Sequence, residues 1–367
     1  ALKIGFISFG DPRRKDTWSG TPHSIFVRLS REHEVEWLDT NGLNTRLLRL
    51  IYGLMGKLTG RTLRYYHTNA FASVLHRNLC NYGLQEYDLL FSIGSSDIAF
   101  LKTDVPIIHL ADATFAQMVG YYDNFDMGEK RNREANIIQK KAYWASTQLI
   151  FMSQWAASSA REDYDVPEEK INVLRFGANQ DVPGELREHH ENGTLRMLFV
   201  GKEWERKGGQ IAVDTLNALR QRGIDSTLTM VGCAVPQEVV NTPGLRIVPY
   251  LEDVSPFFRD ADIFLLPTRA ECAGIVFCEA SAYGLPCFTT DTGGISDYVE
   301  EGVNGCLLGL DATGEDFADS IADICADADA LGEMRRKARD RYERELNWDV
   351  WMRGFEGVVK KALSKGR

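Results

Sequence analysis

Residues 265–294 read LLPTRAECAGIVFCEASAYGLPCFTTDTGG, and this stretch decides the fold. It begins inside an apolar run, 262–266, which predicts a buried parallel strand. Pro267 ends that strand because proline has no N–H to donate to a ladder. From about Gly274 the apolar spacing predicts a buried helix, and a second strand follows it toward a Gly-Gly pair at 293–294. Strand, turn, helix and strand in this order predict an α/β unit.

Two carboxylates belong to this unit. Glu271 precedes the helix, and Glu279 lies inside it, about one to two turns beyond Gly274. The N-terminus of a helix offers unpaired N–H groups and the positive end of the helix dipole, which together favour a phosphate. A nucleotide-sugar, with hydroxyl groups at both ends and phosphate between them, fits this arrangement. For an isolated pair of glutamates, a surface carboxylate and an ion-paired helix carboxylate would be the simpler interpretation.

The composition limits the class of protein. A chain of 367 residues is long for one core, so we expect two domains, and 44% hydrophobic with 26% charged residues is typical of a globular protein. The net charge of -10 argues against nucleic acid as the main partner. Seven cysteines without CxxC spacing favour reduced, buried thiols in a cytoplasmic protein. The sequence shows neither a signal-peptide pattern at its start nor an apolar run long enough to span a bilayer.

Strands and helices alternate along the chain in two series. The first series is predicted to contain strands at 3–9, 35–38, 88–93, 105–110, 149–153 and 171–176, with a helix at 22–31 after the first of them. The second series is predicted to contain strands at 195–200, 226–231, 245–248, 263–266, 287–290 and 306–308, with a helix at 209–220. Residues 177–194 are polar and broken by Pro and Gly, which predicts a linker. We therefore expect two doubly wound domains, 1–180 and 194–346, and a C-terminal helix at about 347–367.

Three cations follow the first strand of the second series, in VGKEWERKGG at 200–209. Lys202, Arg206 and Lys207 come after the strand, and a Gly-Gly pair opens the next helix. Cations at the carboxyl end of a strand can neutralise a diphosphate leaving group. Loop cations are more often only solvated, so this signal is weak alone.

Polar residues also follow strands of the first series. The segment VPIIHLAD brings His109 and Asp112 to the carboxyl end of a strand; a hydrogen-bonded core histidine and a helix-capping Asp are the alternatives. Gly20, in WSGT, follows the first strand, where ligands gather in such folds, and an ordinary turn glycine is the alternative.

Two sequences have the D-x-D form of a metal site. Residues 260–262 (DAD) run directly into a core strand, and residues 327–329 (DAD) belong to an acidic surface helix. We therefore predict no metal, with cationic side chains and a helix dipole in its place.

Residues 44–79 differ in charge from the rest of the chain, with six Arg or Lys residues and no acidic residue. The apolar residues at helical spacing within them are Leu47, Leu50, Ile51, Leu54, Met55 and Leu58. Three interpretations stay open. The helix could lie on an anionic membrane surface, with the protein peripheral on the inner face. It could instead be a core-packed helix with a solvated basic face, or part of a basic pocket for a phosphorylated acceptor.

The opening stretch closely resembles the signature of retaining glycosyltransferases of family 4, E-G-F-G-x-x-x-x-E-A-x-A-x-G-x-P followed by a Gly-Gly turn. Here it reads E-C-A-G-I-V-F-C-E-A-S-A-Y-G-L-P and then T-D-T-G-G, departing at Cys272 and Ala273. Residues 200–209 resemble the family's G-R-x-x-x-K-G element, with Lys202 at the usual Arg. The resemblance implies the GT-B fold: two facing Rossmann-like domains, with a C-terminal helix that crosses back to the first.

The resemblance also implies an activity. It is metal-independent transfer, with retention, of a sugar from a nucleotide-diphosphate sugar to a hydroxyl acceptor, such as a lipid-linked or cell-envelope glycan, without a cofactor. Glu279 would bind the ribose, Glu271 the sugar hydroxyls, and Lys207, with Lys202 or Arg206, the diphosphate. The other donor-binding residues that it implies are Gly20, Tyr250, Leu251, Ala273, Gly274 and Ile275. His109 and Asp112 join Glu271 and Lys207 as catalytic candidates, because many relatives carry a sugar-binding His near this position. A non-catalytic nucleotide-sugar binding protein, an epimerase and a phosphorylase are the alternatives.

Overall fold

A computed structural model describes residues 1–59, 65–123, 125–186 and 193–364 of the chain. Contacts divide the chain into two compact units: unit 1 is Ala1–Leu174 with Met352–Arg367, and unit 2 is Arg175–Trp351. The chain thus leaves unit 1 a few residues before the predicted linker at 177–194. Residues 187–192 of that linker, and 60–64 of the basic segment, lie outside the described residues.

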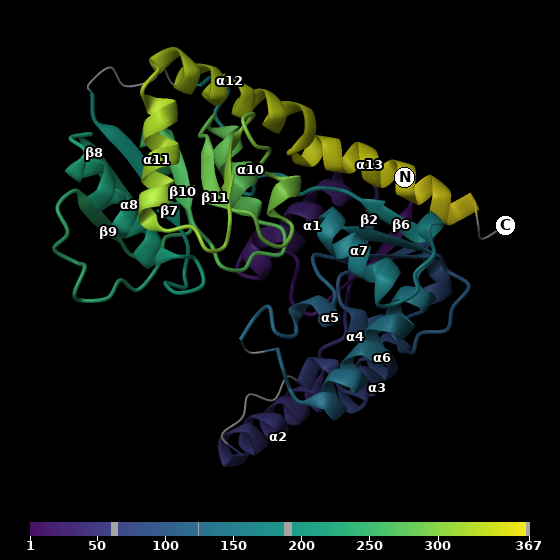
Figure 1. Cartoon of the computed structure of the whole chain (residues 1–367). Coiled ribbons are helices and arrows are strands. Elements are labelled where there is room, and N and C mark those ends of the chain that lie inside the picture. Colours follow the sequence, from purple (N-terminus) through teal and green to yellow (C-terminus); the bar gives the residue numbers. More distant parts are fainter. Residues whose placement is uncertain (60–64, 124, 187–192, 365–367) are drawn as a thin grey trace. The chain divides into compact units, whose positions relative to one another are not determined.

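Residues 1–174 of unit 1 are coloured from purple to teal in Figure 1. This unit is built on six parallel strands in the order β2-β1-β3-β4-β5-β6. The strands are β1 (Lys3–Ser8), β2 (Glu34–Asp39), β3 (Leu89–Ser92), β4 (Ile107–Ala111), β5 (Gln148–Phe151) and β6 (Ile171–Val173). The helices are α1 (Thr21–Glu32), α2 (Leu43–Thr59), α3 (Asn69–Leu79), α4 (Ser95–Ile98), α5 (Phe115–Met118), α6 (Glu129–Ala145) and α7 (Gln154–Glu162). Every residue of β3 and β5 is buried, which is why these strands read as continuous apolar runs.

Unit 2 repeats this plan with the strand order β12-β11-β10-β7-β8-β9, again all parallel. The strands are β7 (Leu195–Val200), β8 (Ser226–Val231), β9 (Leu245–Val248), β10 (Ile263–Leu266), β11 (Cys287–Thr290) and β12 (Gly305–Leu308). The helices are α8 (Gly209–Gln221), α9 (Ser255–Asp260), α10 (Ile275–Ala282), α11 (Gly314–Cys325) and α12 (Ala328–Glu345). The crossovers through α8 and α10 run in opposite directions from the centre of the sheet, so right-handed connections place these helices on opposite faces. Accordingly α8 contacts α11, and α10 contacts α12.

The strand order reverses once in each sheet. The reversal lies between β1 and β3 in unit 1 and between β7 and β10 in unit 2. Ligands of open α/β sheets bind at this switch point, just beyond the carboxyl ends of the strands. The loops that carry Lys207 and Glu271 follow β7 and β10, the two strands at the switch point of unit 2.

The predicted fold class is confirmed. Each predicted strand is present, with ends that differ by at most three residues. The Gly-Gly pair at 293–294 leads into a single 3-10 turn, Ile295–Asp297. The last helix, α13 (Trp348–Ser364), starts in unit 2 and continues in unit 1. None of the described helices is both long enough and apolar enough to cross a membrane.

Candidate functional site

Two loops meet at the switch point of unit 2. The backbone of Gly208, in the loop between β7 and α8, lies so close to Pro267 that an added Cβ would be 2.0 Å from the Pro267 carbonyl oxygen. Gly208 also has a φ of +71°, in the left-handed region that favours glycine. The carbonyl oxygen of Arg206 accepts hydrogen bonds from the Arg269 N–H (2.7 Å) and the Thr268 hydroxyl (3.1 Å). The loops after β7 and β10 are therefore fixed to each other.

This contact brings together two residues that the sequence analysis selected separately. Lys207 Nζ forms a short ion pair with Glu271 Oε2, and both side chains are largely buried. Arg206 Nη1 lies 3.8 Å from the same carboxylate oxygen. The guanidinium of Arg206 also donates to the Ala270 carbonyl oxygen (2.9 Å) and pairs with Glu203 (2.7 Å). Arg206 thus holds the turn before Glu271, while Lys207 neutralises the Glu271 carboxylate.

The turn that leads into α10 keeps a left-handed glycine. Gly274 is the N-cap residue with a φ of +57°, and a Cβ there would be 2.4 Å from Phe277 Cδ2. Cys272 and Ala273, which depart from the signature, are buried, so their side chains pack inward. Ile275 is the first residue of α10. The two departures are therefore compatible with a turn that presents the start of α10 to a ligand.

Glu279 is buried within α10 and accepts a hydrogen bond from the Asn179 N–H (3.3 Å). Burial raises the pKa of Glu279 to about 7, opposed by the backbone hydrogen bonds from Asn179 and Gln180. Both donors belong to the predicted linker, and nothing in the sequence pairs them with this glutamate. The segment after β6 is thus an ordered support for Glu279.

An aromatic side chain lies at the end of β9. Tyr250 and Leu251 are exposed, and Lys202 Nζ lies 4.1 Å from the centroid of the Tyr250 ring. Tyr250, predicted to contact the donor base, therefore lies beside Lys202, predicted to contact the diphosphate. Together with Lys207 and Glu271, they occupy the carboxyl edge of β9, β7 and β10, which are part of one sheet.

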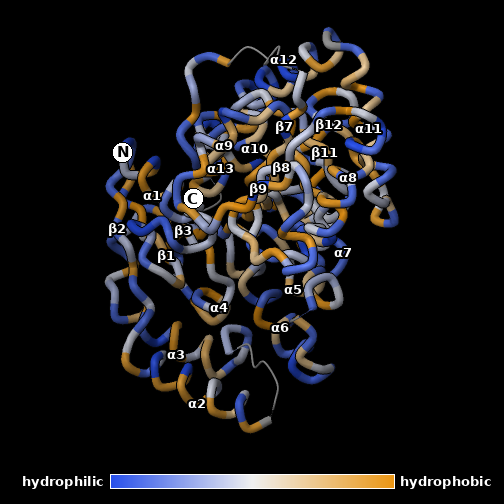
Figure 2. Tube along the Cα trace, turned by 90° about the vertical axis from the view of Figure 1, so that its left-hand side faces the viewer, coloured by the Kyte–Doolittle hydropathy of each residue, from blue (hydrophilic) through white to orange (hydrophobic). Residues whose placement is uncertain are grey.

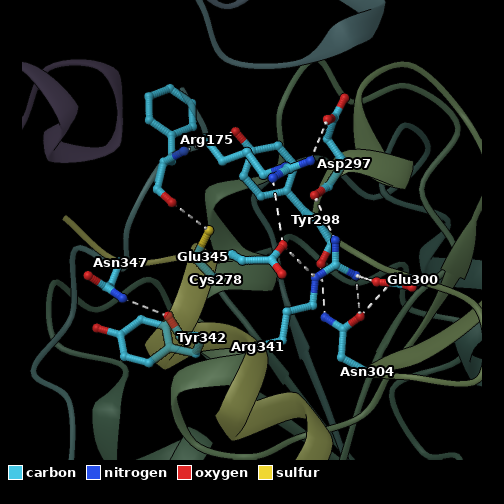
Figure 3. Close-up of polar contacts among 11 residues, drawn as sticks. Arg175, Cys278, Asp297, Tyr298, Glu300, Asn304, Arg341, Tyr342, Glu345 and Asn347 are labelled. Atoms are coloured by element: carbon cyan, nitrogen blue, oxygen red, sulfur yellow. Dashed lines mark hydrogen bonds and ion pairs between the residues drawn. The ribbon is translucent and has the colours of Figure 1, made fainter. Parts of the chain in front are cut away.

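A polar cluster braces α10 from within unit 2 (Figure 3). The guanidinium of Arg341, on α12, donates to Asn304 Oδ1 (2.9 Å) and to the Asp297 carbonyl oxygen (3.0 Å). Asn304 in turn donates to the Ser281 hydroxyl of α10 (3.1 Å). Burial lowers the pKa of Arg341 despite the carboxylates around it. This cluster was not predicted from the sequence, because the sequence of α12 is mostly charged and gives no sign that Arg341 is buried.

Unit 1 contains a pocket of about 510 Å³ at its own switch point. Its walls come from the segments that follow β1, β2, β3 and β4, together with α2, α3 and α5. Polar side chains that line the pocket include Asn41, Arg49, Asp97, His109 and Asp112, and aromatic ones include Trp18, Tyr66, Phe115 and Phe125. The pocket thus combines an apolar wall with a few polar groups, as small-molecule sites do.

His109 and Asp112 both line this pocket, in different states. His109 is buried, with Nδ1 3.1 Å from the Ser92 carbonyl oxygen and Nε2 3.0 Å from the Ser95 hydroxyl. Burial lowers the pKa of His109 to about 4, so the ring is neutral at pH 7. Asp112 is half-buried, and the residue that caps α5 is Thr114. The helix-cap interpretation of Asp112 is therefore wrong, and its role at a site stays a prediction.

One acidic residue of the pocket, Asp97, was not predicted from the sequence. Asp97 is buried, accepts a hydrogen bond from the Thr40 hydroxyl (2.6 Å), and has a pKa raised to about 6 by burial. It follows β3 in the sequence Gly94-Ser95-Ser96-Asp97. Glycine and polar residues directly after a buried strand were the available signal.

The loop that carries Gly20 is strained. Trp18, Ser19 and Gly20 have φ values of +46°, +53° and +79°, three consecutive left-handed residues before α1. For a non-glycine residue this conformation costs about 1 to 2 kcal/mol. Such strain often accompanies a functional loop, and Trp18 lines the pocket of unit 1.

The D-x-D residues have structural surroundings. The Asp262 carboxylate is buried and accepts the Arg196 N–H (2.9 Å), and Asp327 caps α12. Within the described part of the chain, one group of side chains, Glu32, His33 and Glu356, is close enough to hold a metal ion, and it lies in unit 1. The absence of a metal from the reaction stays a prediction.

Residues 194–327 match the family model for glycosyl transferases group 1. A D-inositol 3-phosphate glycosyltransferase of Corynebacterium kroppenstedtii is 24% identical over 93% of this chain and 81% of its own length. A D-inositol 3-phosphate glycosyltransferase of Pseudarthrobacter chlorophenolicus is 32% identical over 65% of this chain and 61% of its own length. The solved structure of Anabaena HepE in complex with UDP and glucose has a TM-score of 0.66 at 16% identity, over 98% of this chain and all of its own. These findings support a glycosyltransferase with the GT-B fold.

Proposed function

We propose that this protein is a retaining glycosyltransferase of family 4, which transfers a sugar from a nucleotide-diphosphate sugar to an acceptor hydroxyl without a metal ion. The Lys207–Glu271 pair at the switch point of unit 2 is the observation that carries this proposal. It provides one cation for a diphosphate and one carboxylate for sugar hydroxyls, between two loops that are fixed to each other. The group 1 model, which covers the same residues, supports the assignment.

Each donor group has a proposed partner in unit 2. The bond between sugar C1 and the phosphate oxygen breaks while a bond from the acceptor oxygen to C1 forms. The proton of the acceptor hydroxyl passes to the departing diphosphate or to water. Lys207 and the N–H groups at the start of α10 stabilise the charge on the departing diphosphate. Lys202 is the second cation rather than Arg206, because the Arg206 guanidinium is bound to Glu203 and Ala270.

Glu271 accepts hydrogen bonds from the sugar, Glu279 from the ribose, and Tyr250 with Leu251 forms the wall beside the base. The cations and the α10 dipole do the work that a divalent ion does in other transferases. We assign the acceptor to the pocket of unit 1, where Asp97 and Asp112 can accept hydrogen bonds from its hydroxyls. A lipid-linked or cell-envelope glycan is the proposed acceptor class.

The first experiment is a thermal-shift screen with UDP-, GDP- and ADP-sugars, because a ligand that binds only the folded state raises the melting temperature. Nucleotide release is then measured with the donor found and a panel of glycan acceptors, and NMR of the product gives its anomeric configuration. Release without an acceptor would indicate hydrolysis or isomerisation, and tight binding without release would favour a binding protein.

The site assignment is tested with Lys207→Gln and Glu271→Gln. Removing one group that stabilises transition-state charge lowers kcat by about 100- to 1,000-fold, and we expect this range for Lys207→Gln. Arg222→Gln is the control, since Arg222 pairs with Glu315 and Asp319 at the surface. Transfer by both site variants at the rate of the wild type and of the Arg222→Gln control would refute the proposal. Full activity in excess EDTA is expected, and loss of activity would refute metal independence.

A further inference from the structure

The outer face of α2 is apolar. Seven large hydrophobic side chains of this helix are exposed, by fractions from 41% to 86%: Leu43, Leu47, Leu50, Ile51, Leu54, Met55 and Leu58. Figure 2 shows hydrophobic residues recurring along α2. At about 100° of rotation per residue, these seven lie within one stripe about 140° wide. A domain helix normally turns such a stripe toward the core, so the core-packed interpretation of this segment is wrong.

The opposite face of α2 attaches the helix to unit 1 through polar groups. Arg49 Nη2 donates to Asn41 Oδ1 (2.9 Å), and its guanidinium lies 5.7 Å from the centroid of the Tyr65 ring. The buried Thr45 hydroxyl donates to the Gly42 carbonyl oxygen (2.7 Å). Arg49 is therefore a residue of the inner face, and the exposed stripe lies on the opposite face of the helix.

The charge around the stripe identifies that surface. Residues 43–79 contain no Asp or Glu in a chain of net charge -10, and the exposed cations Arg46 and Lys57 border the stripe on one side. Cations beside an apolar helical face are typical of helices that lie in the interface of an anionic membrane. A second copy of the chain would meet Arg46 and Lys57 with the same cations and with no carboxylate from this segment.

We propose that α2 docks unit 1 onto an anionic lipid bilayer. The leucines of the stripe enter the boundary between headgroups and acyl chains, and Arg46 and Lys57 contact lipid phosphates. The inner face of the same helix carries Arg49, which lines the pocket of unit 1. One further point rests on the proposed function: the pocket would receive the head of an acceptor that is held in the bilayer.

The test is flotation of the full chain with vesicles of phosphatidylcholine, with and without phosphatidylglycerol, at low salt. We expect flotation with the anionic vesicles and a loss of about tenfold or more in the bound fraction for Leu50→Glu with Leu54→Glu. Replacing Arg46 and Lys57 with Gln should weaken binding by about fivefold for each cation removed. Ile137→Glu with Leu310→Glu is the control, since both residues are exposed outside α2 and should leave flotation unchanged.

Three results would overturn the proposal. The first is no flotation with anionic vesicles at low salt. The second is flotation that the α2 leucine variant leaves unchanged. The third is a change confined to self-association in light scattering, which would assign the stripe to a second copy. The assay needs neither donor nor acceptor, so a chain that floats but releases no nucleotide would contradict the proposed function and leave the docking surface standing.

Discussion

The close contact at Gly208 predicts a large loss of stability in Gly208→Ala. A non-glycine residue in the left-handed region costs about 1 to 2 kcal/mol. An alanine Cβ would in addition lie 2.0 Å from the Pro267 carbonyl oxygen, where ordinary contacts begin at 3.4 Å. The two loops must therefore separate by more than 1 Å, and overpacking of this kind costs about 1 to 3 kcal/mol. We expect the free energy of unfolding to fall by about 2 to 5 kcal/mol.

Gly223→Ala is the matched control. Gly223 has a φ of +80°, and an added Cβ there would have no neighbour within 4 Å, so it reports the backbone cost alone. Urea titrations monitored by circular dichroism give both free energies of unfolding. The reasoning is refuted if the two variants are destabilised equally, within about 0.5 kcal/mol. Amide hydrogen exchange provides a second readout, because separation of the loops should increase exchange at Arg269, whose N–H is bound to Arg206.

Three further predictions concern buried groups. The pKa of Glu279 is about 7 in the folded protein, against an ordinary value of 4.5 in the unfolded chain. As the pH rises from 4.5 to 7, the unfolded chain loses this proton first, so Glu279 lowers the free energy of unfolding across this range. Glu279→Gln should exceed the wild type in unfolding free energy by at most about 3 kcal/mol above pH 7 and match it near pH 4, and a constant difference would contradict this. The NMR signals of the His109 ring should not titrate between about pH 5.5 and 8, and a midpoint near the ordinary value would contradict its pKa of about 4. Ellman's reagent should label the exposed Cys80 in the native protein. It should label Cys278 and Cys287 only after unfolding, because burial raises the pKa of both thiols, and rapid labelling of either in the native protein would contradict its burial.

The central strands were predictable because burial on both faces makes them nearly continuous apolar runs. In β10, for example, all residues are buried, and Pro267 marks the end of the strand in the sequence. The same signal located the loops after β7 and β10, and hence Lys207 and Glu271. Their ion pair was not predictable, because it depends on β7 and β10 being neighbours in the sheet. Periodicity gives the existence of a strand but not its partners.

Other features depended on tertiary structure in the same way. The spacing of apolar residues in α2 defines a stripe but not the direction in which it faces, since the polar contacts of Arg49 set that direction. The hydrogen bond from Asn179 to Glu279 joins a predicted linker to a helix a hundred residues away. For Asp97 the sequence offers its place after a buried strand, but only the structure shows that the segments after four strands line one pocket with it.

On the proposed function, the ion pair between Lys207 and Glu271 also bears on the release of the product. A free anion that binds Lys207 leaves the Glu271 carboxylate without its main counter-charge. An intact nucleotide-sugar would bind Lys207 as well, but its sugar hydroxyl groups would donate hydrogen bonds to that carboxylate. A nucleoside diphosphate without a sugar meets only half of this requirement. In the proposed reaction Lys207 would return to Glu271 as the nucleoside diphosphate departs, so the ion pair that the substrate replaces would also favour release of the product.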